Sequence, residues 1–246
     1  MFHKQLKIQE GALIISDAHY SPSRPELFFL IEEIFLEKRV IPQLILMGDI
    51  FDNLFGGISY TYKANQTLID MLNAISLKID VIYLEGNHDF QLHKIFQNMT
   101  IVPINMQPIM LSYQEKKILL AHGDFDGAVG YKIYTALIRN PFVLLILKFI
   151  DNLTRHSIIN FVDKHLEKKD DCNEFSGFEK FIQNRIINKY SCDYFIEGHY
   201  HQNKRYRWKD LNYINLAAFA CNQRYFIVKS IQDNELLEEK SFSKGI

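Results

Sequence analysis

Five short clusters of acidic, amide and imidazole residues each follow an apolar run in this 246-residue chain. The clusters are Asp17-Ala18-His19, Gly48-Asp49-Ile50-Phe51-Asp52, Gly86-Asn87-His88-Asp89, His122-Gly123-Asp124 and Gly198-His199-Tyr200-His201. The runs before them have the length and the branched or aromatic content of buried strands, at residues 12–16, 44–47, 81–84, 118–121 and 194–196. Because α/β sheets place their sites where strands end, we expect the five clusters to form one site.

The side chains of these clusters form a donor set that suits transition metals. It comprises two carboxylates, one amide oxygen and four imidazoles: Asp17, Asp49, Asn87, His19, His122, His199 and His201. A mixed set of this kind favours Mn²⁺, Fe²⁺ or Zn²⁺ over Ca²⁺ and Mg²⁺, which prefer oxygen alone. Seven ligands exceed the three of a catalytic zinc, so we expect two ions that share one carboxylate. Such pairs lie about 3.5 to 4 Å apart and activate water, which indicates phosphoester hydrolysis.

Each cluster alone would be weak evidence for a metal site. Asn and Gly are ordinary turn residues, and a lone His is more often a surface or core residue than a ligand. If the five clusters were ordinary turns, five unrelated turns would each have to carry potential ligands directly after a strand-like run by chance. We therefore treat the set as specific.

Length and composition agree with a single domain that spans residues 1–246. The chain is 48% hydrophobic, and an α/β domain of this size can bury a large core without a second unit. The formal net charge is −1, whereas nucleic-acid-binding domains usually carry a basic surplus. We therefore expect no nucleic-acid partner.

The cysteines and the N-terminus indicate a cytoplasmic protein. Cys172, Cys192 and Cys221 are odd in number and follow no CxxC spacing, so we expect neither a disulfide framework nor a zinc knuckle. Residues 1–10 are polar and lack the apolar core of a signal peptide, so we do not expect export.

Apolar spacing predicts the elements between and after the clusters. Residues 25–38 and 62–77 repeat apolar side chains at three- and four-residue steps, which predicts amphipathic helices packed on a sheet. Residues 205–208, 213–216 and 225–228 read as strands of a closing sheet. The polar residues after them predict a solvated tail.

The interval between the fourth and fifth clusters is longer than one crossover needs, which predicts a helical lid insertion at residues 126–190. Residues 142–150 are almost wholly apolar, too few to cross a bilayer, and basic residues surround them: Arg139, Lys148, Arg155, Lys164, Lys168 and Lys169. One interpretation is a buried helix of an inserted cap. The other is a lid with an exposed apolar face and a basic rim, which lies at a membrane surface or covers an acyl chain.

The order Asp-x-His, Gly-Asp-x-x-Asp, Gly-Asn-His-Asp, His-Gly-Asp and Gly-His-x-His resembles the calcineurin-like metallophosphoesterase superfamily. The resemblance implies an α/β fold of four layers, α/β/β/α, with two facing sheets. It also implies a first metal bound by Asp17, His19 and His201, a second bound by Asn87, His122 and His199, and Asp49 as the bridge. By the same resemblance His88 acts on the phosphate or the leaving oxygen, and Asp89 orients His88.

The insertion resembles the lid of the UDP-2,3-diacylglucosamine pyrophosphatases of lipid A synthesis, the LpxH-like branch. The matching residues are Tyr131, Tyr134 and Ile138-Arg139-Asn140-Pro141. This resemblance implies Mn²⁺, an amphiphilic UDP-sugar lipid as substrate, release of UMP and lipid X, and a peripheral location on the cytoplasmic face of the inner membrane. Those enzymes commonly carry Arg where this chain has His88, so a divergent enzyme of the same step, such as the LpxJ type, is an alternative.

Several assignments stay open at this point. We expect Asn87, His88, Tyr131, Tyr134 and Arg139 to contact substrate, since a guanidinium fork matches phosphate oxygens. Arg139 could equally be a solvated lid residue. The alternative functions are a phosphatase or phosphodiesterase that acts on another phosphoester, and a nuclease. A non-enzymatic scaffold is disfavoured because all seven ligands are present.

Overall fold

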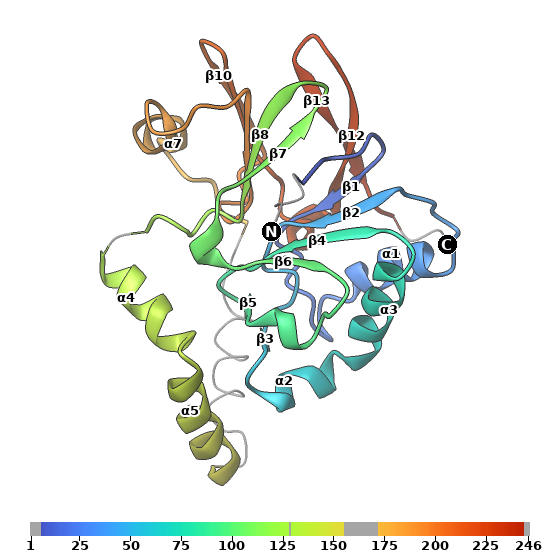
Figure 1. The fold of residues 1–246 in the computed structure, drawn as a ribbon, viewed down its shortest axis with the longest axis vertical. Helices are drawn as coiled ribbons and strands as arrows, with labels where there is room; N and C mark the ends of the chain where they lie inside the picture. The colour runs from blue at the N-terminus through green and yellow to red at the C-terminus, as the bar shows by residue number, and fades with distance from the viewer. Residues whose placement is uncertain (1–5, 128, 155–171, 244–246) are drawn as a thin grey trace, which may run out of the picture.

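A computed structural model describes residues 6–127, 129–154 and 172–243 of the chain. Two β-sheets face each other, and helices cover their outer faces (Figure 1). This is the predicted α/β/β/α arrangement, and the fold prediction is confirmed.

The first sheet contains three of the five strands that lead into the clusters. β1, β2, β4 and β6 are parallel, and β12 and β13 extend the sheet with antiparallel pairing. The order across the sheet is β13 (Glu235–Ser241), β12 (Arg224–Gln232), β1 (Leu13–Ile15), β2 (Gln43–Leu46), β4 (Asp80–Leu84) and β6 (Thr100–Val102).

The second sheet supplies the other two cluster-bearing strands. β8, β9 and β11 are parallel, and β7 and β10 form antiparallel edges. The order is β10 (Lys204–Trp208), β11 (Leu211–Asn215), β9 (Tyr194–Glu197), β8 (Lys116–Ala121) and β7 (Ile109–Tyr113). A small parallel pair, β3 (Leu54–Phe55) and β5 (Asp89–Phe90), lies beside the first sheet.

Alternating side chains divide the core into layers. Leu13 and Ile15 of β1 face the helices α1 (Glu26–Phe35) and α3 (Gln66–Ser76), whereas Ile14 faces the second sheet. On the far side of the second sheet, α7 (Phe178–Ile186) packs against β9 and β11 through buried Phe and Ile side chains. The predicted helix at 62–77 is divided, because Asn65 ends α2 (Ser59–Ala64) before α3 begins. The described residues also form the short helices η1 (Leu92–Lys94), η2 (Ile104–Met106) and α8 (Phe219–Asn222).

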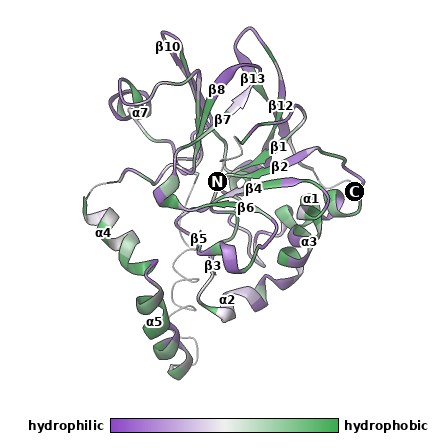
Figure 2. Ribbon diagram, viewed as in Figure 1, coloured by the Kyte–Doolittle hydropathy of each residue, from purple (hydrophilic) through white to green (hydrophobic). Residues whose placement is uncertain are grey.

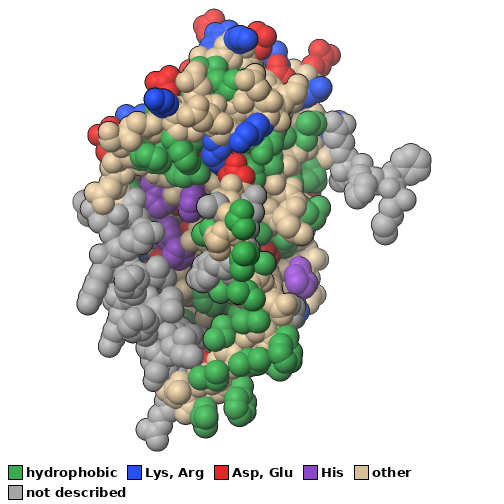
Figure 3. All heavy atoms as spheres, turned by 90° about the vertical axis from the view of Figure 1, so that its left-hand side faces the viewer, with side chains coloured by type: hydrophobic (Ala, Val, Ile, Leu, Met, Phe, Trp, Pro, Cys, Tyr) green, Lys and Arg blue, Asp and Glu red, His purple; other side chains and the backbone are tan. Residues whose placement is uncertain are grey.

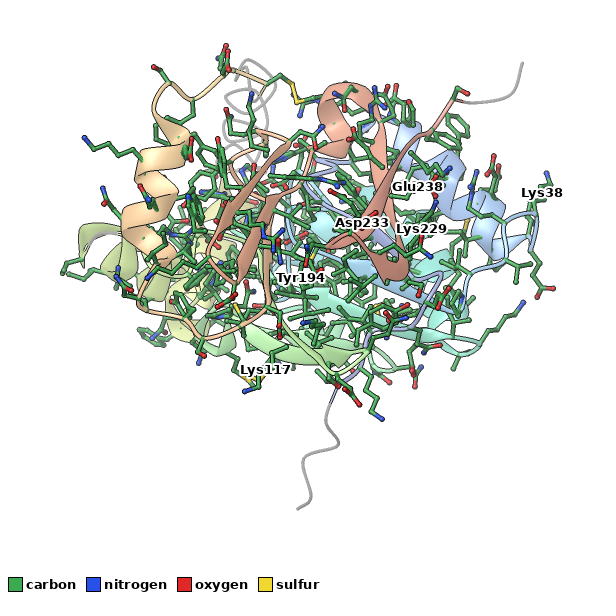
Figure 4. All side chains as sticks on the ribbon, turned by 90° about the horizontal axis from the view of Figure 1, so that it is seen from above. Lys38, Lys117, Tyr194, Lys229, Asp233 and Glu238 are labelled. Carbon is green, nitrogen blue, oxygen red and sulfur yellow. A yellow bond between two sulfur atoms is a disulfide. The ribbon has the colours of Figure 1, made fainter. Side chains whose placement is uncertain are left out.

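Two predictions about the C-terminal third are wrong. The expected solvated tail includes β13, where Leu236 and Leu237 are buried between the sheets beside charged residues that face outward. Cys172 and Cys221 form a disulfide, visible as the yellow bond in Figure 4, although they lie 49 residues apart. Their pairing follows from proximity in the fold, which no local spacing encodes; Cys192 is free.

The helices α4 (Val129–Ile138) and α5 (Pro141–Leu153) project from the sandwich, and we call them the helical arm (Figure 1). Hydrophobic residues predominate along α5 (Figure 2). Phe142 and Phe149 are 69% and 70% exposed, whereas Leu144 is 3% exposed and packs with Ile58 and Phe90. The arm therefore combines buried residues, Leu144, Thr135 and Asp151, with an exposed apolar face.

Two further observations bear on the predicted insertion. Its part at α7 packs on the second sheet, so the projecting portion among the described residues is the helical arm. Among those residues no single helix is long and apolar enough to cross a membrane; α4 and α5 meet that test only together, by length and composition, with a 65° bend between them. The basic residues Arg155, Lys164, Lys168 and Lys169 lie outside the described residues.

Candidate metal centre

The five clusters converge at the carboxyl ends of five parallel strands. Asp17 follows β1, Asp49 follows β2 and Asn87 follows β4, while His122 and His199 follow β8 and β9 of the facing sheet. Histidine side chains gather on the face of the molecule shown in Figure 3, beside the apolar ridge in its lower half. The sheets thus deliver side chains from two sides to one place.

One group of possible ligands contains Asp17, His19 and His201, whose donor atoms lie within 4.8 Å of one another. His201 Nε2 lies 3.1 Å from Asp17 Oδ1. His19 Nδ1 lies 3.2 Å from Asp52 Oδ1, and His19 Nε2 is buried without a hydrogen-bond partner. A carboxylate on one ring nitrogen commonly fixes the tautomer that leaves the other nitrogen for a metal.

A second group contains Asp49, His122 and His199, again within 4.8 Å. His122 Nε2 lies 3.3 Å from Asp49 Oδ2, and its Nδ1 lies 2.9 Å from the Met47 carbonyl oxygen. Asn87 Oδ1 is buried without a hydrogen-bond partner, as is His122 Nε2. Buried polar atoms rarely stay unpaired, so these atoms fit a site that a cation completes.

The backbone at the clusters is held in an uncommon conformation. Five of the seven predicted ligands have positive φ: Asp17, His19, Asp49, His199 and His201. Non-glycine residues in this region are strained, and such residues concentrate at functional sites. Gly86 has its own requirement, because a side chain there would collide with the Asp49 carboxylate.

His88 belongs to a third group of possible ligands, with His19 and Asp52, whose donor atoms also lie within 4.8 Å of one another. Its Nε2 is 4.0 Å from Asp49 Oδ2, and its backbone N–H donates to Asp49 Oδ1 at 2.8 Å. His88 Nδ1 lies 2.9 Å from the carbonyl oxygen of Asp52. Because a carbonyl only accepts, Nδ1 carries the hydrogen, and Nε2 is directed to the site.

The predicted role of Asp89 is corrected by these contacts. The partner of the His88 ring is the Asp52 carbonyl, not the Asp89 carboxylate. Asp89 instead accepts hydrogen bonds from the backbone N–H groups of Asp49, Ile50 and Gly86 and from Tyr83 Oη. Asp89 therefore links the loop of the second cluster to the loop of the third through backbone hydrogen bonds.

Asp52 is the residue of the site that sequence reasoning did not assign. Its carboxylate contacts His19 and its carbonyl contacts His88. The signal was present, since Asp52 closes the Gly-Asp-x-x-Asp motif. Spacing alone does not tell a ligand from a residue that orients one.

Mutual charge interactions set the protonation of the buried groups. Burial would raise the pKa of Asp17, but the charge and hydrogen bond of His201 outweigh it and hold that pKa at about 2. Burial and the neighbouring His122 lower the pKa of His199 to about 3. Burial and the charge of Asp49 raise the pKa of Asp89 to about 7. Against the effect of burial, the carboxylates of Asp52 and Asp49 raise the pKa of His19 and His122, respectively. Ionised carboxylates and neutral imidazoles bind metal, so a bound cation would displace the protons that these two rings hold.

The predicted substrate contacts lie on the side of the helical arm. Arg139 Nη2 donates to the Gly86 carbonyl at 2.7 Å, and its guanidinium lies over the Phe90 ring, with a 5.2 Å distance to the centroid. Tyr131 Oη donates to Asp124 Oδ2 at 3.0 Å. Tyr134 belongs to α4, but its side chain lies outside the described part of the structure. Arg139 is therefore packed against the third cluster and is not a solvated lid residue.

Comparison with known proteins extends this picture. The family model of the calcineurin-like phosphoesterases matches residues 12–203. A UDP-2,3-diacylglucosamine hydrolase of Pseudomonas fluorescens is 23% identical over 77% of this chain and 78% of its own length. That of Vibrio parahaemolyticus is 27% identical over 77% and 81%. Among solved structures, an archaeal phosphodiesterase aligns over 94% of this chain and 99% of its own, at 14% identity and a TM-score of 0.47.

Proposed function

Since this chain belongs to the calcineurin-like phosphoesterase family and is a metal-dependent phosphoester hydrolase, we propose that its substrate is UDP-2,3-diacylglucosamine. Hydrolysis of the pyrophosphate would release UMP and 2,3-diacylglucosamine 1-phosphate, lipid X. The relatives that carry this substrate in their names match about three quarters of the chain.

The observation that carries the proposal is the position of an exposed apolar surface beside a phosphoesterase site. Arg139, between α4 and α5, contacts Gly86 of the third cluster, so the bend of the helical arm lies at the edge of the candidate metal centre. Its exposed apolar side chains include Leu137, Phe142, Leu145 and Phe149. Large exposed apolar patches mark binding surfaces, and this one suits acyl chains. A small soluble phosphoester would have no use for it.

We assign the ligands as two overlapping sets. Asp17, His19 and His201 would hold one ion, and Asn87, His122 and His199 the other, with Asp49 between them. The native ion is most consistent with Mn²⁺, which accepts a mixture of oxygen and imidazole donors. Bound ions supply Lewis acidity toward the phosphoryl oxygens and lower the pKa of water.

In this mechanism His88 acts as the general acid. Its Nδ1–H donates to the Asp52 carbonyl, which orients the ring so that Nε2 faces the site and can pass a proton to the leaving phosphate oxygen. The water oxygen bonds to one phosphorus and releases a proton to solvent, while the bridging P–O bond breaks and the leaving phosphate keeps its electron pair and takes the proton from His88. Asn87 and His88 contact the phosphoryl group from the third cluster.

The lipid half of the substrate determines the location. Acyl chains that pack on the exposed face of the helical arm keep the enzyme at the surface where the substrate lies, the cytoplasmic face of the inner membrane. Tyr131 and Arg139 contact Asp124 and Gly86 of the clusters, and we assign these two residues, together with Tyr134 of α4, to the sugar and its phosphates. A guanidinium fork suits that role.

A parallel assay tests the substrate. Metal-stripped protein is given Mn²⁺ and offered UDP-2,3-diacylglucosamine, UDP-glucose, bis-p-nitrophenyl phosphate and single-stranded DNA. The proposal predicts that UMP release from the diacylated substrate has the highest kcat/KM and depends on added metal. Preference for UDP-glucose or bis-p-nitrophenyl phosphate would indicate another phosphoesterase, and preference for DNA would indicate a nuclease; either result would overturn the assignment.

A further inference from the structure

Arg185 of α7 forms a buried ionic network behind the candidate metal centre. The residue is 8% exposed. Its Nη1 donates to both carboxylate oxygens of Glu197 at 2.6 and 2.8 Å, and Nη2 donates to the Gly123 carbonyl at 2.8 Å. Nε donates to Asp126 Oδ1 at 2.7 Å. All three guanidinium nitrogens are therefore engaged, from a helix that carries none of the predicted ligands.

The partners of Arg185 flank two ligands of one ion. Gly123 directly follows His122, and Glu197 ends β9 two residues before His199. The two loops also touch directly, since Gly198 N–H donates to the His122 carbonyl at 2.8 Å. A Cβ atom on Gly123, whose φ is +137°, would lie 2.7 Å from His199 Cβ. Small displacements of either loop would change the spacing of the two imidazoles.

Other side chains complete the network around Arg185. Tyr213 Oη donates to Glu197 Oε1 at 2.6 Å, and Tyr200 Oη donates to the Gly123 carbonyl at 3.2 Å. The guanidinium lies over the rings of Phe125 and Tyr200, 4.8 and 5.4 Å from their centroids. A buried charge is tolerated only when it is paired and hydrogen-bonded, and a planar fork contacts several partners at fixed angles.

We propose that Arg185 is a positioning residue that holds the loops carrying His122 and His199 at the spacing one divalent ion requires. The inference rests on the two-ion assignment of the proposed function, but it does not depend on the substrate. It predicts that the network shapes the site before metal binds. The proposal also predicts that only the ion assigned to His122 and His199 depends on Arg185. The described contacts of Arg185 do not include Asp17 or His19, which are assigned to the other ion.

The test compares a single and a double variant in Mn²⁺ titrations of metal-stripped protein, with free Mn²⁺ followed by electron paramagnetic resonance. Arg185→Met leaves Glu197 buried and unpaired, so this variant should be destabilised. Arg185→Met with Glu197→Gln removes both charges, which often restores stability. We expect the double variant to recover its melting temperature but to bind the second ion about 10- to 100-fold more weakly, the usual cost of losing a residue that orients ligands. Recovery of stability and metal affinity together would overturn the proposal.

Two controls use the same titration. Asp126→Ala removes one partner of Arg185 and leaves its contacts with Glu197 and Gly123, so we expect unchanged Mn²⁺ affinity. Arg185→Lys retains the charge but cannot form the fork, so we expect the second ion to bind as weakly as in the double variant. Wild-type affinity in Arg185→Lys would show that charge alone matters and would contradict the positioning role.

A measurement on the wild-type protein does not require any variant to fold. Hydrogen exchange of the Gly198 amide is followed in metal-stripped protein and after addition of Mn²⁺. If Arg185 organises the loops in advance, exchange is slow in both states because the bond to the His122 carbonyl already exists. Fast exchange that slows only with Mn²⁺ would show that the ion, not Arg185, sets the spacing. No lipid substrate is used, so a wrong substrate assignment would leave this result standing.

Discussion

The metal centre and the helical arm differ in how many contacts fix each residue. Asp49 contacts His122 and the His88 backbone, and the nearby Asp89 carboxylate accepts hydrogen bonds from four backbone N–H groups. On α5, by contrast, Leu144 is buried while its neighbour Leu145 is 64% exposed. The first region is determined by mutual polar contacts, whereas α5 combines the buried residues Leu144 and Asp151 with several exposed apolar side chains.

This difference indicates a division of labour. A site that must hold cations and move a proton needs fixed geometry, which strained backbone and buried hydrogen bonds provide. A surface that accepts acyl chains needs area and little geometry, because apolar contacts are not directional. We therefore expect changes at the metal centre to abolish the chemistry on every substrate, and changes on the arm to affect only the acylated one.

The largest effect is expected for Asp49→Ala. Loss of the carboxylate between the two groups removes the shared anion and the acceptor of the His88 N–H. Turnover should fall to background on all substrates, and metal content by mass spectrometry should fall from two ions to at most one. A purified variant with near-normal turnover and full metal occupancy would refute the bridging assignment.

His88→Ala should have the next largest effect. A positioned acid or base contributes about 10² to 10⁴ in rate, so kcat should fall by that factor on both acylated and small substrates. The matched measurement is metal content, which should stay at the wild-type value because His88 is not an assigned ligand. Loss of one metal equivalent would instead make His88 a ligand.

Substitutions on the buried and exposed faces of α5 should differ in their effect on the free energy of unfolding. Leu144→Ala removes a side chain packed with Ile58 and Phe90, and such changes cost about 2 to 5 kcal/mol. Leu145→Ala, at an exposed position, should change the free energy of unfolding by less than about 0.5 kcal/mol. Urea unfolding with a common slope measures both. Equal losses would mean that the exposed face of the arm is packed in solution.

The parts of the molecule that local pattern controls were predictable from sequence. Buried strands read as apolar runs, and chain reversal after each run places polar residues at one edge, so the positions of Asp17, Asp49 and His122 followed from their neighbours. The four layers followed from the resemblance to the metallophosphoesterase superfamily. The predicted ligand set remains a prediction, although the structure brings its residues together.

The parts that tertiary contacts control were not predictable. Leu236 and Leu237 lie among charged residues, and only pairing with β12 makes that segment a strand. The disulfide between Cys172 and Cys221 joins residues with no common motif. Arg185 gave no signal, since one arginine on an amphipathic helix is ordinarily solvated. The apolar run at 142–150 fitted a core helix and an exposed lid equally, because periodicity does not report what a helix packs against.

The most direct test of the central claim is a ratio of specificity constants in one arm variant. Leu145→Ser with Phe149→Ser removes two exposed apolar side chains, and each loses roughly 1.5 to 3 kcal/mol of possible burial against an acyl chain. Since about 1.4 kcal/mol is tenfold, we predict that kcat/KM on UDP-2,3-diacylglucosamine falls by at least about tenfold relative to bis-p-nitrophenyl phosphate. Metal content and unfolding midpoint should not change. An unchanged ratio, or an equal loss on both substrates, would contradict the claim that the metal centre supplies the chemistry and the arm selects the lipid.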